Sequence, residues 1–417
     1  MKIYKLLICT LLFSGMLFTS CSDDDSPDID DYPLNYEIPQ ISVDADIPVG
    51  AFLYNPGGAF SDEIRWERIT EPYNAATGKV GPHIMPELGR YNLRADTAGA
   101  LAARQLVEWA KLAKIDFLIT PGVREHANDI YPRNINREDS ALVDLFGGHN
   151  DTLPSLNMGD MKYAISLDIN NFCSGLSNNV LIETAPTHKL TIDGRDTLLT
   201  REERLYSWIK RVSHYFGDPT YYHSNGRPVL ILNDADKLYS EDTKKIYDNI
   251  RTTIKGHTGK DVYIIARQPS WSPSARFEHF FLKGKADAVT MNNMCDVKGG
   301  QWDRTYWLNQ LINENFKFNR EYISNNYGID FIPSVSASYS QYVANGDYSY
   351  PLVPKDPEQF RKRCNVAKMN LGQNRMALIE SMNHWYFNTQ IEPTVPTYGK
   401  GYGTAYLDIV REEFKRK

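Results

Sequence analysis

Pro228-Val229-Leu230-Ile231-Leu232-Asn233 is a short apolar run closed by a polar residue. A helical pattern follows over 241–256, and a second apolar run covers 262–266. A buried strand, a helix and another buried strand in this order are typical of a parallel sheet, because the chain must cross back over the sheet between parallel strands. This stretch therefore predicts an α/β fold.

The same alternation extends over most of the chain. Eight apolar runs of strand length cover 49–54, 116–120, 163–168, 228–233, 262–266, 288–292, 330–336 and 376–381. The clearest helical segments cover 97–114, 201–216, 241–256, 303–325, 357–371 and 404–417. Eight strand and helix units predict a (β/α)8 TIM barrel in a single domain.

A doubly wound sheet is the alternative to the barrel. It would need a glycine-rich turn after its first strand, and Tyr54-Asn55-Pro56-Gly57-Gly58 does not match a dinucleotide-binding fingerprint. Residues 172–200 are expected to form a long irregular insertion after the third strand. Insertions of this kind usually contribute to a rim or a cleft.

The N-terminal sequence MKIYKLLICTLLFSGMLFTSC, residues 1–21, has the composition of an export signal. Its apolar run is shorter than the ~20 residues needed to span a bilayer. The segment Leu17-Phe18-Thr19-Ser20-Cys21 resembles the lipobox of bacterial lipoproteins, which implies a signal peptide over 1–20 and lipidation of Cys21. An ordinary cleaved signal peptide is the alternative.

Residues 21–45 are expected to form a flexible acidic linker, because Asp, Pro and Ser predominate there. Ser22-Asp23-Asp24-Asp25 resembles the acidic surface-export tag of Bacteroidetes lipoproteins, although a solvated acidic tether explains it equally well. The folded domain is expected over 46–417. These features predict a lipid-anchored protein of the outer membrane that faces the cell exterior.

The composition limits the classes of partner. The chain has 46 Lys+Arg against 52 Asp+Glu, a net charge of −6, and no basic block, so we expect no nucleic-acid partner and membrane contact only through the lipid anchor. The sequence contains no Cys-x-x-Cys pair, which would indicate a metal site, and we expect no cofactor. Cys173, Cys295 and Cys364 are expected to be small buried residues, with one disulfide and a free thiol as the alternative.

Polar and aromatic side chains follow the C-terminal ends of the predicted strands, where TIM barrels place their chemistry. Carboxylate and amide groups pair with sugar hydroxyls, and aromatic rings, which make up 12% of the chain, pack against sugar C–H faces. The predicted ligand is therefore an oligosaccharide or a polysaccharide. The candidate substrate-binding residues are Tyr54, Glu125, His126, Asn170, Asp234, Trp271, Asn292, Trp302, Tyr339, Asn383, Trp385, Tyr386, Gln390 and Glu392.

Several of these candidates have a structural alternative. His126 is a lone histidine for which a surface or structural role is favoured. Asp234 and Asp236 are compatible with a cation site, but capping or ligand contact is favoured because no third carboxylate lies nearby in the sequence. Glu392 is expected to support its loop or to bind a hydroxyl group.

The C-terminal stretch 377–393, ALIESMNHWYFNTQIEP, continues to Tyr398-Gly399 and Tyr406-Leu407. It resembles the last strand and loop of glycoside hydrolase family 99, which contains endo-α-mannosidases, and of the related WbsX-like and family 71-like proteins. Four other segments fit the same pattern in order, namely Gly89-Arg90-Tyr91, Ala113-Lys114-Ile115-Asp116-Phe117, Asn225-Gly226-Arg227-Pro228-Val229 and Pro333-Ser334-Val335-Ser336. The resemblance implies a (β/α)8 barrel that acts on a glycan.

The sequence departs from this family at the positions that carry the chemistry. The last loop of family 99 reads Asn-Glu-Trp-x-Glu-Gly-Thr-x-Ile-Glu, and its first two glutamates do the acid and base work. These two positions fall on His384 and Phe387. The resemblance therefore implies that the loop shape is kept while the chemistry has changed.

Two functional hypotheses follow. In the favoured one, the protein is a glycoside hydrolase with a non-standard catalytic pair, in which Glu380 acts with Asp168 or Asp234, and His384 donates a proton or binds a hydroxyl. Burial of Glu380 in an ion pair with Arg267 is the structural alternative for that residue. In the second hypothesis, the barrel is catalytically inactive and binds glycans within an uptake system, together with other glycan-uptake proteins.

Overall fold

The computed structural model describes residues 32–55, 66–70, 82–176, 180–185, 188–192, 195–297, 306–345 and 353–416. The predicted signal peptide, Cys21, most of the predicted linker and Trp302 lie outside the described residues. Ile38–Lys417 forms one compact unit.

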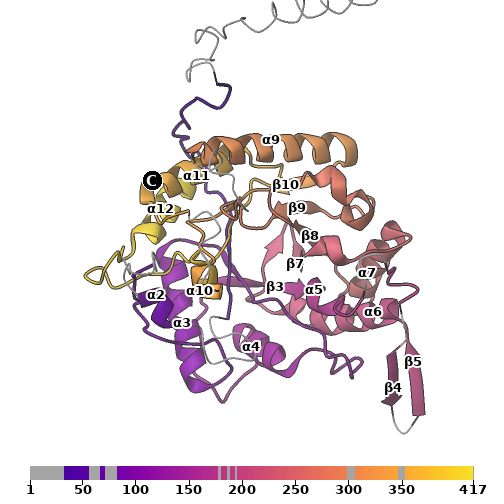
Figure 1. Ribbon diagram of the computed structural model, residues 1–417. Coiled ribbons are helices and arrows are strands. Elements are labelled where there is room, and N and C mark those ends of the chain that lie inside the picture. The colour runs from indigo at the N-terminus through magenta and orange to yellow at the C-terminus, as the bar shows by residue number, and fades with distance from the viewer. Residues whose placement is uncertain are drawn as a thin grey trace, which may run out of the picture. The chain divides into compact units, whose positions relative to one another are not determined.

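Parallel strands form a nearly closed barrel at the centre of this unit (Figure 1). In the described part of the chain they are β1 (Val49–Phe52), β2 (Phe117–Ile119), β3 (Lys162–Asp168), β7 (Arg227–Asn233), β8 (Tyr263–Gln268), β9 (Ala288–Met291), β10 (Asp330–Ile332), β11 (Ser334–Val335) and β12 (Ala377–Ile379). Their spatial order is β10-β9-β8-β7-β3-β2-β1-β12-β11. The short strand β6 (His223–Ser224) pairs antiparallel with the first residues of β7. The predicted TIM barrel is confirmed.

The seventh predicted strand, 330–336, is divided in two at Pro333. Proline has no N–H group and cannot donate to a sheet ladder. The chain before it, β10, pairs with β9, and the chain after it, β11, pairs with β12. The two short strands therefore approach the closure of the barrel from opposite sides.

Helices follow most of the barrel strands, as the sequence predicts. The longer ones are α3 (Thr97–Leu112), α4 (Arg137–Gly147), α6 (Arg201–Val212), α7 (Thr243–Thr258), α9 (Leu308–Tyr327), α11 (Pro357–Met369) and α12 (Ala405–Phe414). Shorter ones are α2 (Trp66–Thr70), α5 (Ile169–Phe172) and α10 (Tyr342–Asn345). Local signals set their ends: Thr200 and Glu203 form a capping box on α6, and Gly259 ends α7 with φ +73°.

The core has an inner and an outer layer, because side chains along a strand alternate between two faces. The inner layer fills the barrel with Phe52, Phe117, Ile119, Ala164, Val229, Ile231, Tyr263, Ile265, Ala288, Ile332, Met376 and Leu378. The larger outer cluster lies between the strands and the helices. This alternation decides which residues at the strand ends face the barrel interior.

Part of the predicted insertion is regular. Residues 172–200 contain an antiparallel hairpin of β4 (His188–Ile192) and β5 (Arg195–Leu199), so the expectation of an irregular segment was wrong there. Ladder pairing such as Thr191 with Asp196 holds the two strands together. Figure 1 shows this hairpin projecting away from the barrel strands.

The compact unit begins at Ile38 rather than at the predicted Asp46. The side-chain amide of Gln40 donates to Glu413 at 2.8 Å, and the backbone N–H of Ile41 donates to Asn365 at 2.6 Å. These polar contacts with α11 and α12, together with the packing of Ile38 and Val43 against the core, hold this segment to the compact unit.

The three described cysteines are free thiols. Cys295 and Cys364 are buried, as predicted, and Cys173 is only partly buried. The alternative of a disulfide among them was wrong.

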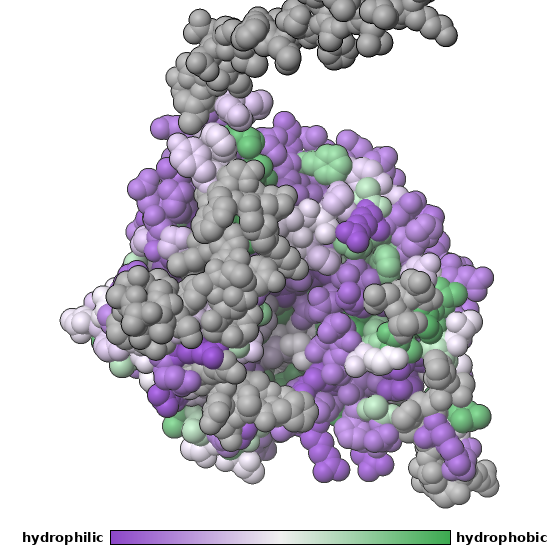
Figure 2. All heavy atoms as spheres, in the orientation of Figure 1, coloured by the Kyte–Doolittle hydropathy of each residue, from purple (hydrophilic) through white to green (hydrophobic). Residues whose placement is uncertain are grey.

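Few large apolar side chains are exposed among the described residues. On the face seen in Figure 2, hydrophilic residues predominate and hydrophobic ones form small patches. No helix in the described ranges combines the length and the apolar character that crossing a membrane requires.

Candidate functional site

A cavity of about 520 Å³ lies at the C-terminal ends of the barrel strands. We call it the central cavity. Side chains on a strand point alternately inward and outward. The inward-facing residues of the cavity wall lie beyond the last inward-facing apolar residue of their strands. It is lined by Tyr54, Gly122, Asp168, Asn170, Asn233, Asp234, Arg267, Pro269, Ser270, Asn292, Asn293, Asp296, Tyr339, Glu380, His384 and Phe387.

An ion pair between Arg267 and Glu380 forms the floor of the central cavity. Nη2 of Arg267 donates to both carboxylate oxygens of Glu380, at 2.8 and 2.7 Å, and both side chains are only 5% exposed. Nη1 of Arg267 donates to the hydroxyl oxygen of Tyr54 at 3.1 Å, and the Tyr54 hydroxyl donates to Glu380 at 3.3 Å. The structural alternative considered for Glu380 is thus present in the structure.

This pairing restricts the chemistry that Glu380 can perform. Burial raises the pKa of Glu380, and the positive charge of Arg267 acts in the opposite direction. Since guanidinium stays charged in proteins, Arg267 requires the carboxylate form of its partner. Glu380 is therefore suited to orienting Tyr54 and Arg267 and poorly suited to donating a proton.

Aromatic rings form one wall of the central cavity. The rings of Tyr54 and His384 are stacked with their centroids 3.8 Å apart, and Phe387 lies edge-on to His384 at 5.1 Å. Phe387 also stacks with Tyr339 at 5.5 Å. His384 and Phe387 thus contribute to an aromatic surface that suits the C–H face of a sugar.

His384 is neutral at physiological pH. Burial, with a contribution from the charge of Arg267, lowers its pKa to about 3. An imidazole that is already deprotonated cannot act as a cationic proton donor near pH 7. Hydroxyl binding and ring stacking are the roles that this environment leaves open to His384.

Carboxylates stand on the side of the cavity formed by β3 and β7. Asp168 ends β3 directly beside Asn233 of β7, and Asp234 follows Asn233. Oδ1 of Asp168 accepts the backbone N–H of Asn171 at 2.8 Å, which caps α5 and fixes the carboxyl group. Asp234 has a left-handed backbone with φ +53°.

The environment of Asp168 raises the pKa of its carboxyl group above the ordinary value, although the hydrogen bond from the N–H of Asn171 acts in the opposite direction. Burial raises the pKa of Asp168, and the negative charge of Asp234 raises it further. Carboxyl groups that share a site and differ in environment commonly divide into an acid and a base or nucleophile. Of the two carboxyl groups, Asp168 is the one whose pKa is raised, and Asp234 is its neighbour in the cavity wall.

Two further cavities meet the central one at Asp168. One, of about 670 Å³, lies beside α3 and α4 and shares Gly122 and Asp168 with the central cavity. The other, of about 590 Å³, shares Asp168 and Asn170. A Cβ atom at Gly122 would lie 3.2 Å from Cβ of Asp168, so glycine keeps the space beside this carboxyl open.

The sequence did not identify Gly122 as a site residue; it indicated Asn233 only as the end of a strand and Arg267 only as a possible ion-pair partner of Glu380. The alternation of the strands would have identified Asn233 and Arg267, because both lie two residues beyond an inward-facing isoleucine. No comparable signal marks Gly122, whose place depends on the neighbouring strand.

Several predicted substrate contacts do not line the central cavity. Glu125 is buried in an ion pair with Arg204, whose Nε donates to it at 2.8 Å. His126 lies 3.2 Å from Asp129. Trp271 packs partly against the outer core, and Tyr386 is exposed, with its hydroxyl donating to the backbone of Ala344 at 3.3 Å.

The other predicted residues of the last loop support the site from behind. Asn383 exchanges two hydrogen bonds of 2.8 Å with the backbone of Tyr54. Trp385 donates its indole N–H to Glu392, which also accepts the hydroxyl of Tyr91 at 2.8 Å. Gln390 is buried, and its backbone carbonyl accepts from Lys355. Asn383, Trp385, Gln390 and Glu392 therefore position the loop.

Glu392 makes the stability of this loop depend on pH. Burial raises its pKa from an ordinary value near 4.5 to about 8. Its stabilising contribution is thus complete below pH 4.5 and is lost as the pH rises through 8. Relative to Glu392→Gln, we expect the wild-type free energy of unfolding to fall by on the order of 4 kcal/mol between pH 5 and 9, measured by urea denaturation.

A neighbouring titration must be separated from this effect. Burial lowers the pKa of Lys355, which gives a slope of the opposite sign. Lys355 is present in both proteins, so most of its own titration cancels in the difference between the two curves, which reports Glu392 together with its charge interaction with Lys355. Parallel curves for wild type and Glu392→Gln would show that Glu392 does not titrate in this range.

Comparisons with known proteins support the architecture. No family model and no curated protein matches the chain. A solved structure described as a glycoside hydrolase-like protein is similar with a TM-score of 0.72 at 24% identity, over 92% of this chain and 98% of that one. A family 99 endo-α-mannosidase from Bacteroides thetaiotaomicron is similar with a TM-score of 0.55 at 15% identity, over 89% and 96% of the two chains. The resemblance to family 99 barrels is confirmed at the level of the fold.

Proposed function

We propose that this protein is a glycoside hydrolase that acts on an oligosaccharide or polysaccharide at the cell surface. The observation that carries the proposal is the central cavity, in which carboxyl groups face an aromatic wall at the C-terminal end of a TIM barrel. Such a cavity binds sugar hydroxyls on one side and C–H faces on the other. The names of the structurally similar glycoside hydrolases support the same class of ligand.

The proposed catalytic pair is Asp168 and Asp234. Asp168, with its raised pKa, protonates the glycosidic oxygen as the bond to the anomeric carbon breaks. Asp234 supplies the second carboxylate, as the base for the attacking water or as the nucleophile. The net reaction adds one water across the bond, giving a free anomeric hydroxyl and an alcohol.

The remaining residues of the cavity have positioning roles in this scheme. Arg267 and Glu380 hold the hydroxyl of Tyr54, and the stack of Tyr54 on His384 presents a flat surface to the sugar. Neutral His384 binds a hydroxyl group. This scheme does not need the glutamates that are replaced by His384 and Phe387.

A glycan-binding barrel without catalysis is the second candidate. It is favoured by one observation, namely that the cavity wall carries a neutral histidine, His384, and a phenylalanine, Phe387, where the resemblance to family 99 implies the acid and the base. Under this proposal the cavity retains a glycan for uptake together with other surface proteins.

The proposed location rests on the N-terminal sequence. The lipobox-like segment ending at Cys21 and the acidic residues after it support a lipid-anchored protein of the outer membrane that faces outward. A surface position would give the cavity access to large external glycans.

A glycan panel tests the proposed function and separates the two candidates. Protein lacking the first 21 residues is incubated with α-mannans, α-glucans and host N-glycans, and products are measured by chromatography and retention by affinity electrophoresis. We expect release of shorter products from at least one glycan. Retention without product would favour the binding protein, and absence of both would contradict a carbohydrate ligand of these classes.

A further inference from the structure

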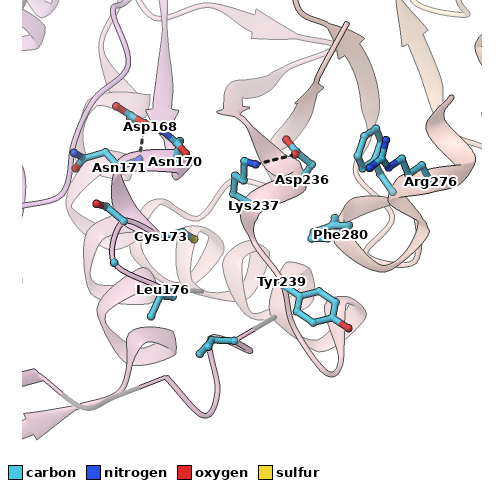
Figure 3. Close-up of a pocket in the computed structure, with 14 residues that line it drawn as sticks. Asp168, Asn170, Asn171, Cys173, Leu176, Asp236, Lys237, Tyr239, Arg276 and Phe280 are labelled. Atoms are coloured by element: carbon cyan, nitrogen blue, oxygen red, sulfur yellow. Dashed lines mark hydrogen bonds and ion pairs between the residues drawn. The ribbon is translucent and has the colours of Figure 1, made fainter. Parts of the chain in front are cut away.

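A second cavity adjoins the central one on the side of β3 and β7, and we call it the lateral cavity. It has a volume of about 590 Å³ and shares Asp168 and Asn170 with the central cavity. In Figure 3, Asp168 and Asn170 lie on one side, Phe280 lies on the other, and Asp236 stands between them. A ligand that fills both cavities must pass over Asp168.

Asp236 presents an unused acceptor in the lateral cavity. Its side chain is 9% exposed, and one oxygen lies 3.7 Å from Nζ of Lys237. The other oxygen, Oδ1, is buried and accepts no hydrogen bond within the described residues. A buried polar atom without a partner costs about 1–3 kcal/mol, and a ligand hydroxyl would remove this cost.

Aromatic side chains stand at the far end of the same cavity. The rings of Tyr239 and Phe280 lie 5.3 Å apart at a tilt of 38°. Rings that face a cavity with a carboxylate and an amide nearby provide the two kinds of contact that a sugar unit needs, namely an apolar surface and hydroxyl partners. The two acidic side chains that line the cavity, Asp168 and Asp236, are matched by two basic ones, Lys237 and Arg276, so a neutral sugar fits better than an acidic one.

We propose that the lateral cavity binds a second, neutral sugar unit of the same glycan, with Asp236 accepting one of its hydroxyls. This inference rests on the proposed function and specifies its substrate class. With one unit in the central cavity and the next in the lateral cavity, the bond between them lies beside Asp168. The substrate is therefore an oligosaccharide of at least two units that is cleaved between these two sites.

The test is the dependence of affinity on chain length. The probes are linear α-mannose and α-glucose oligosaccharides of one to six units, measured by isothermal titration with Asp168→Asn protein to prevent cleavage. We expect affinity to rise at least tenfold from one unit to two or three. In the double variant that carries Asp236→Ala together with Asp168→Asn, most of this rise should be lost, and the affinity for the single unit should be unchanged.

Stability measurements distinguish a binding role of Asp236 from a structural one. Oδ1 has no partner to lose, and the 3.7 Å contact of the other oxygen is with the half-exposed Lys237 and contributes little, so Asp236→Ala should leave the melting temperature unchanged or raise it. Asp261→Ala, at an exposed carboxylate on the surface, is the matched control and should preserve the dependence on chain length.

Three outcomes would overturn the inference in distinguishable ways. If affinity rises with length equally in the Asp236→Ala and Tyr239→Ala proteins, the lateral cavity is not the second site, and the proposed function stands. If Asp236→Ala lowers stability and single-unit affinity together, Asp236 is structural. If no oligosaccharide of either series binds, both the lateral site and the proposed function fail for these glycans.

Discussion

Replacement of Asp168 by asparagine is expected to lower kcat by about 10³-fold with little effect on the fold, since general acid catalysis contributes 10²–10⁴-fold. Asparagine keeps a side-chain oxygen that can still accept the N–H of Asn171, so the cap of α5 is retained. What it removes is the proton that leaves with the glycosidic oxygen. The measurement is the rate of product formation from the glycan that the panel identifies.

A cap of the same type elsewhere provides the control. Asp242 caps α7 by accepting the N–H of Lys245 at 3.0 Å, outside all three cavities described here. Asp242→Asn should therefore retain wild-type activity.

The pH dependence of the wild-type rate gives a second check on Asp168. The rate should decline on the alkaline side as Asp168 loses its proton, at a pH above the ordinary pKa of an aspartate. Full activity in Asp168→Asn would remove Asp168 from the mechanism.

Replacement of Glu380 by glutamine is expected to lower the free energy of unfolding by about 3–5 kcal/mol, the cost of breaking a buried ion pair from one side. The charge of Arg267 would remain in a site where its side chain is only 5% exposed, opposite an amide that cannot neutralise it. Urea denaturation monitored by tryptophan fluorescence measures this loss. Activity should fall as well, because Tyr54 loses its support.

An exposed pair on α11 is the matched control for this substitution. Glu358 lies 3.3 Å from Lys362, with side chains that are 74% and 42% exposed. Glu358→Gln should change stability by less than about 0.5 kcal/mol. A Glu380→Gln protein that unfolds like wild type but forms no product would instead identify Glu380 as a member of the catalytic pair.

The strands were predictable because a strand that is buried on both faces appears in the sequence as a continuous apolar run. Each of the eight apolar runs contains a barrel strand, or two in the case of 330–336. The division of that run follows from Pro333, which was visible in the sequence but was not weighed against its apolar neighbours. The hairpin at β4 and β5 was missed because its two strands pair only with each other, in a sheet separate from the barrel.

The site was predictable to the extent that it depends on strand position. Tyr54, Asp168, Asn292 and Glu380 line the central cavity because they follow the inward alternation of their strands. Partners that are distant in sequence were harder to foresee: Glu125 is occupied by Arg204, which comes from α6. A residue's position at a strand end therefore predicted that it lies near the cavity. Whether its side chain is free to bind a ligand depends on ion pairs with residues that are distant in sequence.

The left-handed backbone at Asp234 limits how this protein can change in evolution. Residues other than glycine, asparagine and aspartate are strained at φ +53°. Asparagine is therefore the substitution that removes the carboxylate with the least disturbance of the backbone. It keeps the shape of the side chain and one acceptor oxygen, and it replaces the other oxygen with an amide donor. If Asp234 is the second carboxylate, as proposed above, a single nucleotide change in its codon would be enough to convert the hydrolase into a glycan-binding protein.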